Sequence, residues 1–165
     1  MTTKTRYAGQ TQVTKTATLA ELENILEKYG ATSFIAGNHE GDATIAFQIA
    51  GLRILIRIPL PEVTETRFTH TPRRGTARHR DAVHAEHQTA IRATWRALLL
   101  LVKAKLVAVD QGVTTIEREF LPHILLPSGD TLADVALPEI TAAYQRGEVP
   151  ALIAGTTRRA IEGGN

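Results

Sequence analysis

The sequence contains no cysteine, so the chain has neither a disulfide framework nor a thiolate ligand for a metal ion. Serine occurs only at Ser33 and Ser128, and neither position lies in a motif typical of a nucleophile. The chain also lacks a Walker loop, a G-x-G-x-x-G fingerprint and a G-x-S-x-G elbow. Because no motif argues for an enzyme or for a bound cofactor, we expect a protein that acts by binding.

A long uninterrupted apolar run is also missing. The longest run, from Ala97 to Val102, is closely flanked by Arg96, Lys103 and Lys105, whereas a membrane span needs about 20 apolar residues. The N-terminus lacks the charged-then-apolar pattern of a secretory signal. The sequence therefore predicts a cytoplasmic protein with no membrane partner, and its 165 residues are typical of one domain.

The stretch from Asp81 to Gln111 predicts one long helix. It has no internal glycine or proline, and its apolar residues recur at spacings of three and four. The middle turns are apolar nearly all round, which indicates a helix covered on more than one side. At about 1.5 Å per residue it is about 45 Å long, so we expect part of it to protrude or to meet another subunit. The apolar stripe comprises Ile91, Trp95, Leu98, Val102, Leu106 and Val109.

Three segments before this helix predict an antiparallel sheet. The first strand is expected over residues 32–36, followed by a turn over residues 37–42. In the next two strands, 44–49 and 52–58, the side chains alternate between the two faces, and the intervening Ala50-Gly51 fits a two-residue hairpin turn. One face of the sheet is therefore aliphatic and packs on helices. The other face presents Gln48, Arg53 and Arg57.

Capping-box patterns, in which a hydroxyl and a carboxylate satisfy two unpaired amides, predict smaller helices on both sides of this core. The first of these helices ends at Gly30, and the last reaches Arg146 with a kink or break at Pro138. The boxes are Thr18-x-x-Glu21, Thr114-x-x-Glu117 and Thr131-x-x-Asp134. The predicted fold class is α+β, with a three-stranded antiparallel sheet packed on a long central helix and smaller N- and C-terminal helices.

We expect three segments along the chain. Residues 1–16 are polar, rich in threonine and basic, which is typical of a flexible arm. Residues 17–147 form the single α+β domain, and residues 148–165 form a C-terminal tail.

Charge is concentrated in two regions of opposite sign, although the net charge of the whole chain is only +2. Residues 67–96 contain seven arginines and two acids, a net charge of +5. Residues 110–148 contain seven acids and two arginines, a net charge of −5. Two such poles can steer an anionic partner to one face, and they can equally let copies of the protein stack head to tail.

The basic region predicts a contact with nucleic acid. The loop over residues 62–80 is long for a compact domain, and such loops are usually functional or disordered. The arginine fork gives a phosphate two parallel hydrogen bonds, and Phe68 offers a base a stacking surface. With arginines of the outer sheet face and of the central helix, the loop is expected to line one basic groove. The alternatives are a solubilising loop and a solvated helix face. The candidate nucleic-acid-binding residues are Arg53, Arg57, Arg67, Phe68, Arg73, Arg74, Arg78, Arg80, Arg92 and Arg96.

Histidines near the start of the central helix raise the alternative of a metal site. His84-x-x-His87 places two imidazoles on one helical face, but it lacks the H-E-x-x-H spacing and a third ligand. The cluster of His39, Glu40 and Asp42 fits a polar turn better than the metal site of a nuclease. We therefore expect no bound metal.

Two resemblances extend this interpretation. The stretches YGATSFIAG, RILIRIPLP and WRALLLLVKAKLVAVDQGVTTIEREFLPHILLPSGDTLADVALPEI resemble small proteins of tailed phages of actinobacteria, over most of residues 22–145. This resemblance implies a phage or prophage origin and a location in the host cytoplasm. The order of elements is similar to the core of phage single-strand annealing recombinases, the Redβ/RecT/Erf-like group. That similarity implies an oligomer that holds single-stranded DNA in a basic groove between hairpin and helix.

The sequence thus favours a phage-type nucleic-acid-binding protein, homo-oligomeric and non-enzymatic, that anneals or protects single-stranded DNA during recombination. Two alternatives stay open. One is an oligomeric protein-interaction module, a phage structural or host-modulating factor that uses the surplus apolar surface around Leu98–Val102. The other is a small metal-dependent nuclease that uses histidines and carboxylates.

Overall fold

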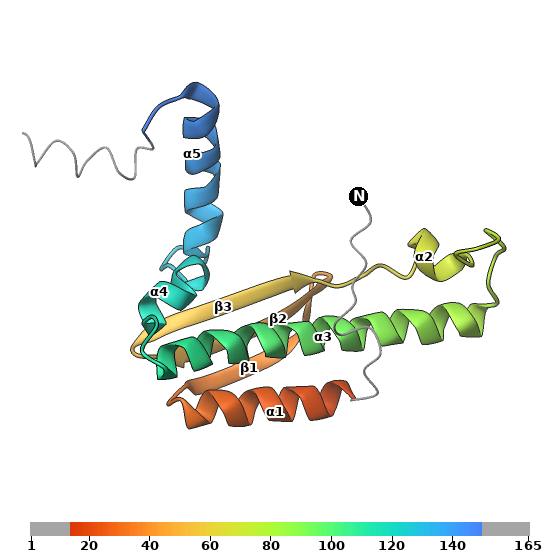
Figure 1. The fold of residues 1–165 in the computed structure, drawn as a ribbon, viewed down its shortest axis with the longest axis horizontal. Coiled ribbons are helices and arrows are strands. Elements are labelled where there is room, and N and C mark those ends of the chain that lie inside the picture. Colours follow the sequence, from red (N-terminus) through yellow and green to blue (C-terminus); the bar gives the residue numbers. More distant parts are fainter. Residues whose placement is uncertain (1–13, 150–165) are drawn as a thin grey trace, which may run out of the picture.

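The computed structural model describes residues 14–149 and contains one sheet, one long helix and several smaller helices (Figure 1). The strand order is β1-β2-β3, and both neighbouring pairs are antiparallel. The predicted α+β fold class is therefore confirmed. In chain order the elements are α1 (Lys15–Lys28), β1 (Thr32–His39), β2 (Asp42–Ile49), β3 (Leu52–Pro59), α2 (Thr66–Thr69), α3 (Arg80–Asp110), α4 (Ile116–Phe120), the 3₁₀ turn η1 (Leu121–His123) and α5 (Leu132–Arg146).

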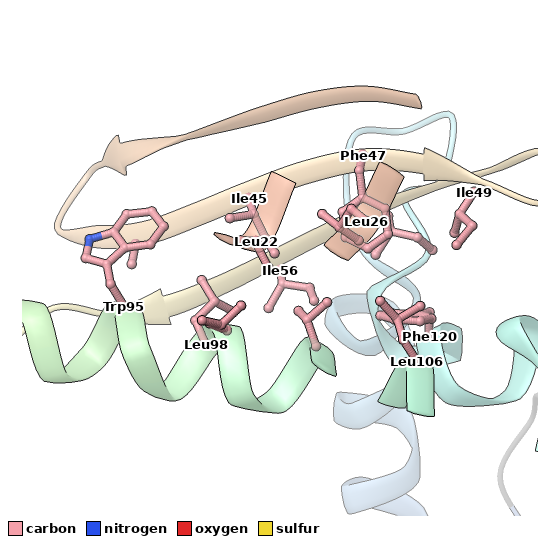
Figure 2. Packing of buried hydrophobic residues seen from close by; sticks show 14 residues of the cluster. Leu22, Leu26, Ile45, Phe47, Ile49, Ile56, Trp95, Leu98, Leu106 and Phe120 are labelled. Atoms are coloured by element: carbon pink, nitrogen blue, oxygen red, sulfur yellow. The ribbon is translucent and has the colours of Figure 1, made fainter. Parts of the chain in front are cut away.

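The hydrophobic core lies between one face of the sheet and the two helices α1 and α3 (Figure 2). Alternate residues of β2 and β3 point toward α3, as the sequence pattern predicts, and the apolar stripe of α3 packs against them. Trp95 is fully buried, and the Lys15 ammonium lies 4.8 Å from the centroid of its ring. The core consists of Leu22, Leu26, Ala43, Ile45, Phe47, Ile49, Ile54, Ile56, Trp95, Leu98, Leu99, Val102, Leu106 and Phe120.

Both hairpins turn through two residues with positive φ. Ala50 and Gly51 have φ of 49° and 79°, which confirms the predicted turn and matches the twist of the flanking strands. Glu40 and Gly41 have φ of 50° and 88° and form the other turn. The predicted six-residue turn over 37–42 is therefore wrong. Its polar composition suggested a loop, but its outer residues continue the strands, and His39 pairs with Asp42.

The first helix begins earlier than predicted. The Thr14 hydroxyl caps α1 by accepting a hydrogen bond from the amide of Ala17, at 3.2 Å. Thr18 lies inside the helix with 1% of its surface exposed, so the predicted capping box at Thr18 is wrong. Lys15 and Thr16 are likewise helical and do not belong to the predicted arm. The remainder of that arm, residues 1–13, and residues 150–165 of the predicted tail lie outside the described residues.

The two later capping boxes are closer to the predictions than the first. The second cap is displaced by one residue, because Thr115 rather than Thr114 accepts a hydrogen bond from the Arg118 amide. The box of Thr131 and Asp134 is present as predicted. Helix α5 continues through Pro138, so of the predicted kink or break the break is wrong, although the proline supplies no amide to the helix.

Helix α3 is unbroken over 31 residues, as the sequence predicts. Its buried positions all fall between Trp95 and Leu106, and residues 80–94 contain none. No helix within the described range combines the length and apolar content needed to cross a bilayer.

We predict that Leu98→Ala lowers the free energy of unfolding by about 2–5 kcal/mol, because it opens a cavity in the core between α3 and the sheet. Leu101→Ala is the matched control on the same helix. Leu101 is 39% exposed, so its truncation should cost about 0.5 kcal/mol. Urea denaturation of both variants measures the difference, and equal costs would contradict this assignment of the buried face.

Candidate nucleic-acid interface

Residues 62–79, which we call the finger, fold into a small ordered lobe. Helix α2 is followed by a hairpin in which His70 pairs with Ala77. The amide of Thr71 donates to the carbonyl of Thr76 at 2.9 Å, and the amide of Arg78 donates to the carbonyl of Thr69 at 2.7 Å. Gly75, with φ of 61°, closes the tip. The long polar loop of the sequence is therefore a folded element.

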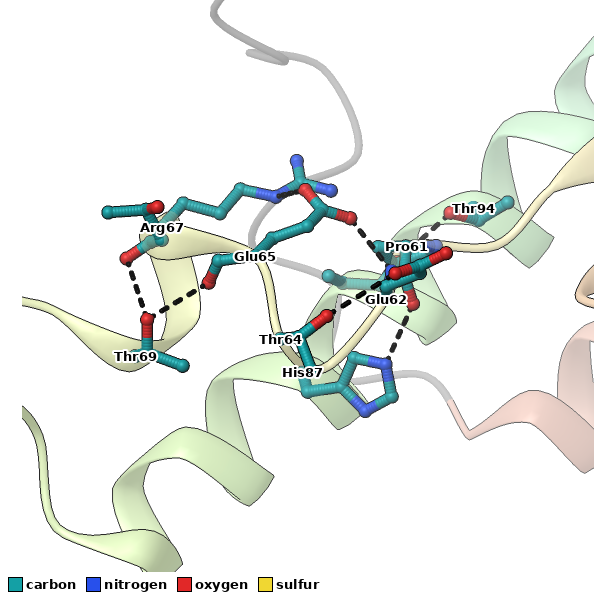
Figure 3. A network of polar contacts seen from close by, with 10 residues as sticks. Pro61, Glu62, Thr64, Glu65, Arg67, Thr69, His87 and Thr94 are labelled. Carbon is teal, nitrogen blue, oxygen red and sulfur yellow. Dashed lines mark hydrogen bonds and ion pairs between the residues drawn. The ribbon is translucent and has the colours of Figure 1, made fainter.

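The finger is held against α3 by one aromatic and two polar contacts. The Phe68 ring is 4% exposed and meets the His87 ring edge-on, with the centroids 5.5 Å apart. His87 Nε2 lies 2.8 Å from the carbonyl oxygen of Pro61, the residue directly before the finger, which Figure 3 shows from close by. Arg78 donates to the Glu86 carboxylate at 2.8 Å. These contacts give His87 and Arg78 structural roles in positioning the finger.

Four of the ten candidate residues are arginines that face carboxylates. Arg67 pairs with Glu65 at 2.7 Å (Figure 3). Its guanidinium group also lies over the ring of Phe68, at 4.7 Å from the ring centroid. Arg96 of α3 pairs with Glu21 of α1, 75 positions away in the chain. The other two pairs are Arg57 with Asp134, at 3.9 Å, and Arg78 with Glu86. Ion pairs at the surface contribute about 0–1 kcal/mol each, so the main effect of these exposed and partly buried pairs is to fix and neutralise the guanidinium groups.

The remaining candidate arginines have no carboxylate partner among residues 14–149. Arg73 and Arg74 are exposed at the tip of the finger, and Arg80 is exposed at the first residue of α3. Arg92 is partly buried and donates to the Thr89 hydroxyl at 2.8 Å. Arg53 is exposed on β3.

The predicted single groove does not form from all ten residues. Ile54 and Ile56 are buried on the face of β3 that meets α3, so Arg53 and Arg57 lie on the opposite face of the sheet. They cannot line a groove together with arginines of α3. Phe68 is buried between the finger and α3, so the predicted stacking surface is also absent from this arrangement. The exposed arginines that remain near one another are Arg73 and Arg74 at the finger tip and Arg80 at the start of α3.

The N-terminal end of α3 adds to the positive potential at this site. The helix dipole places partial positive charge there, which disfavours a cation such as Arg80 and is only partly offset by Asp81. The last turn of α3 has no basic residue and ends at Asp110. Figure 1 shows the finger beside the first turns of α3, and α4, η1 and α5 at its other end. The two oppositely charged regions of the sequence therefore lie at opposite ends of the long helix.

Sequence reasoning missed a groove between the finger, α3 and the end of β3. Its volume is about 290 Å³, and the small side chains of Ala90, Ala93 and Ala97 leave this space open on α3. The pattern of α3 gave no sign of it, because the opposite wall comes from segments far away in the chain. That wall consists of Ile58, Pro59, Pro61, Arg67 and Phe68.

The histidines do not gather into a metal site. Within residues 14–149 no three His, Asp or Glu side chains are arranged to hold a metal ion. His39 approaches Glu40 at 3.9 Å in an exposed turn.

Three side chains beyond the C-terminal end of α3, away from the finger, have shifted pKa values. Hydrogen bonds from the amide and hydroxyl of Thr131 lower the pKa of Asp134, with a smaller contribution from Arg57. A hydrogen bond from Thr115 lowers the pKa of Glu117. Burial, and then the charge of Lys105, lower the pKa of His123. The shifted carboxylates belong to helix caps, which indicates structural roles.

Comparisons with protein-family models, curated proteins and solved structures found no match to this chain.

We predict that His123→Gln reduces the loss of stability at mildly acidic pH. The folded-state pKa of His123 lies below its ordinary value of 6.5, so below that pH the unfolded chain takes up the proton first. The native protein should therefore lose free energy of unfolding as the pH falls below 6.5, and the variant should lose less. Urea denaturation at a series of pH values measures this slope. Parallel slopes for the two proteins would contradict the assignment.

Proposed function

We propose that this chain binds nucleic acid through phosphate contacts made by the finger tip and the start of α3. The proposal rests on one observation, that some arginines of this region are ion-paired and others are not. Arg67 and Arg78 are neutralised by Glu65 of the finger and Glu86 of α3. Arg73, Arg74 and Arg80 are exposed and have no carboxylate partner among residues 14–149. A guanidinium group suits phosphate because its planar fork donates two parallel charge-assisted hydrogen bonds.

The folded state of the finger supports the same proposal. The hairpin bonds and the Phe68 and Arg78 contacts fix its backbone before any ligand arrives. A preorganised surface avoids part of the entropy cost that a disordered arginine loop pays on binding. The adjacent helix N-terminus favours a bound anion.

The order of elements is similar to that of the single-strand annealing recombinases. The specific form of the proposal is therefore that the chain anneals or protects single-stranded DNA. With Phe68 buried, the finger offers phosphate contacts rather than base stacking. Affinity should then follow phosphate charge density and depend steeply on salt for single-stranded and double-stranded DNA alike. A much tighter complex with one form would identify the strandedness of the ligand.

We predict that changing Arg73, Arg74 and Arg80 together to alanine weakens DNA binding and flattens its salt dependence. Each phosphate contact contributes about 0.7–0.9 to the slope of log affinity against log salt, so the slope should fall by roughly 2–3. Fluorescence anisotropy with labelled single-stranded and double-stranded oligonucleotides at several salt concentrations provides the measurement.

The control removes the same charge from elsewhere, by changing Lys103, Arg118 and Arg146 to alanine. These exposed residues lie on the later part of α3 and on α4 and α5. This variant should retain most of the affinity and the slope. Equal losses in the two triple variants would mean that net charge, and not the finger tip, governs binding, and unchanged binding in the first variant would reject the site.

A further inference from the structure

Helix α5 exposes an apolar stripe that the described fold leaves open. Leu137 is 58% exposed and Tyr144 is 83% exposed, and the partly buried Ile140 lies between them at helical spacing. The helix is anchored at its first turn, by the Thr131 cap and the Arg57–Asp134 pair. Figure 1 shows the remainder of α5 standing away from the sheet and α3. An amphipathic helix of this kind is typical of a subunit interface.

The groove beside the finger offers a surface of matching character. Its floor on α3 consists of alanine and threonine side chains and of Glu86, which pairs with Arg78, and its far wall is formed by Ile58, Pro59, Pro61, Arg67 and Phe68. A cavity of about 290 Å³ has room for large apolar side chains. Aromatic side chains that enter such pockets often dominate the affinity of an interface.

The net charges of the two regions favour α5 of a second copy as the partner of this groove. The groove lies among residues 67–96, which carry a net charge of +5, although its own charged lining residues, Arg67 and Glu86, are paired with Glu65 and Arg78. Helix α5 lies at the acidic end, within residues 110–148 and their net charge of −5. Pairing two α5 helices would bring acidic segments together, whereas pairing α5 with the groove brings opposite charges together.

We propose that copies of this chain associate head to tail, with the α5 stripe of one copy packed into the groove of another. Because each copy carries both surfaces, the interface is heterologous, and assembly continues until a ring closes or a filament grows. This association does not require nucleic acid.

The test uses the full chain without nucleic acid, in sedimentation velocity over a series of protein concentrations. The unmodified protein should form species larger than a dimer as the concentration rises. Tyr144→Asp on α5 and Ala97→Arg in the groove should each remain monomeric. Their matched controls are Gln145→Asp, on α5 outside the stripe, and Ala104→Arg, an exposed position further along α3. Both controls should assemble like the unmodified protein.

A mixture of the two interface variants distinguishes a head-to-tail interface from an α5–α5 interface. The Ala97→Arg copy retains its α5 stripe and the Tyr144→Asp copy retains its groove, so an equimolar mixture should form a heterodimer that cannot extend. Circular dichroism and thermal unfolding establish that both variants are folded. A monomeric unmodified protein at every concentration would overturn the proposal. Self-association of the Ala97→Arg variant, without a heterodimer in the mixture, would instead indicate an α5–α5 interface and also overturn it.

The finger-tip variant separates this proposal from the proposed function. Changing Arg73, Arg74 and Arg80 to alanine leaves the groove lining and α5 intact, so this protein should still assemble. Loss of DNA binding with intact assembly would support both proposals. A protein that binds DNA but never assembles would refute the assembly alone.

Discussion

The packing of α3 on the inner face of the sheet is the constraint on which the other features depend. Each strand has eight residues, about 26 Å of extended chain, whereas the 31 residues of α3 extend for about 46 Å. The sheet therefore covers only part of the helix, and the buried positions lie between Trp95 and Leu106. The first turns of α3 extend beyond this buried section, and they provide the platform on which the finger folds.

Carboxylates decide which arginines remain available at that platform. Glu86 fixes Arg78 and Glu65 fixes Arg67, so these two side chains stabilise the finger instead of extending from it. The arginines at the tip and at the start of α3 keep their charge exposed, where the helix dipole gives them no stabilisation. Arg80, in the first turn of α3, lowers the stability of the helix there, and a bound anion would compensate for that cost. We therefore interpret this arrangement as a feature of binding.

Much of the fold could be predicted from the sequence, because periodicity reports directly on which face is buried. The alternation around Ile45 and Ile54 gave the sheet and its inner face, and the stripe through Trp95 gave the helix. The site was harder to predict, since its geometry depends on partners distant in the chain. Nothing near Arg96 reveals that Glu21 neutralises it. Phe68, in a polar loop, had no local pattern to indicate that His87 would help to bury it.

We propose that the exposed arginines of the finger tip and α3 contact nucleic acid while the paired ones do not. This proposal is tested most directly by following the arginine Nε–Hε signals in NMR spectra during titration with a short oligonucleotide. The account predicts that the signals of Arg73, Arg74 and Arg80 move with added DNA, while those of Arg78 and Arg96 stay in place. Movement confined to Arg53 and Arg57, on the far face of the sheet, would contradict it.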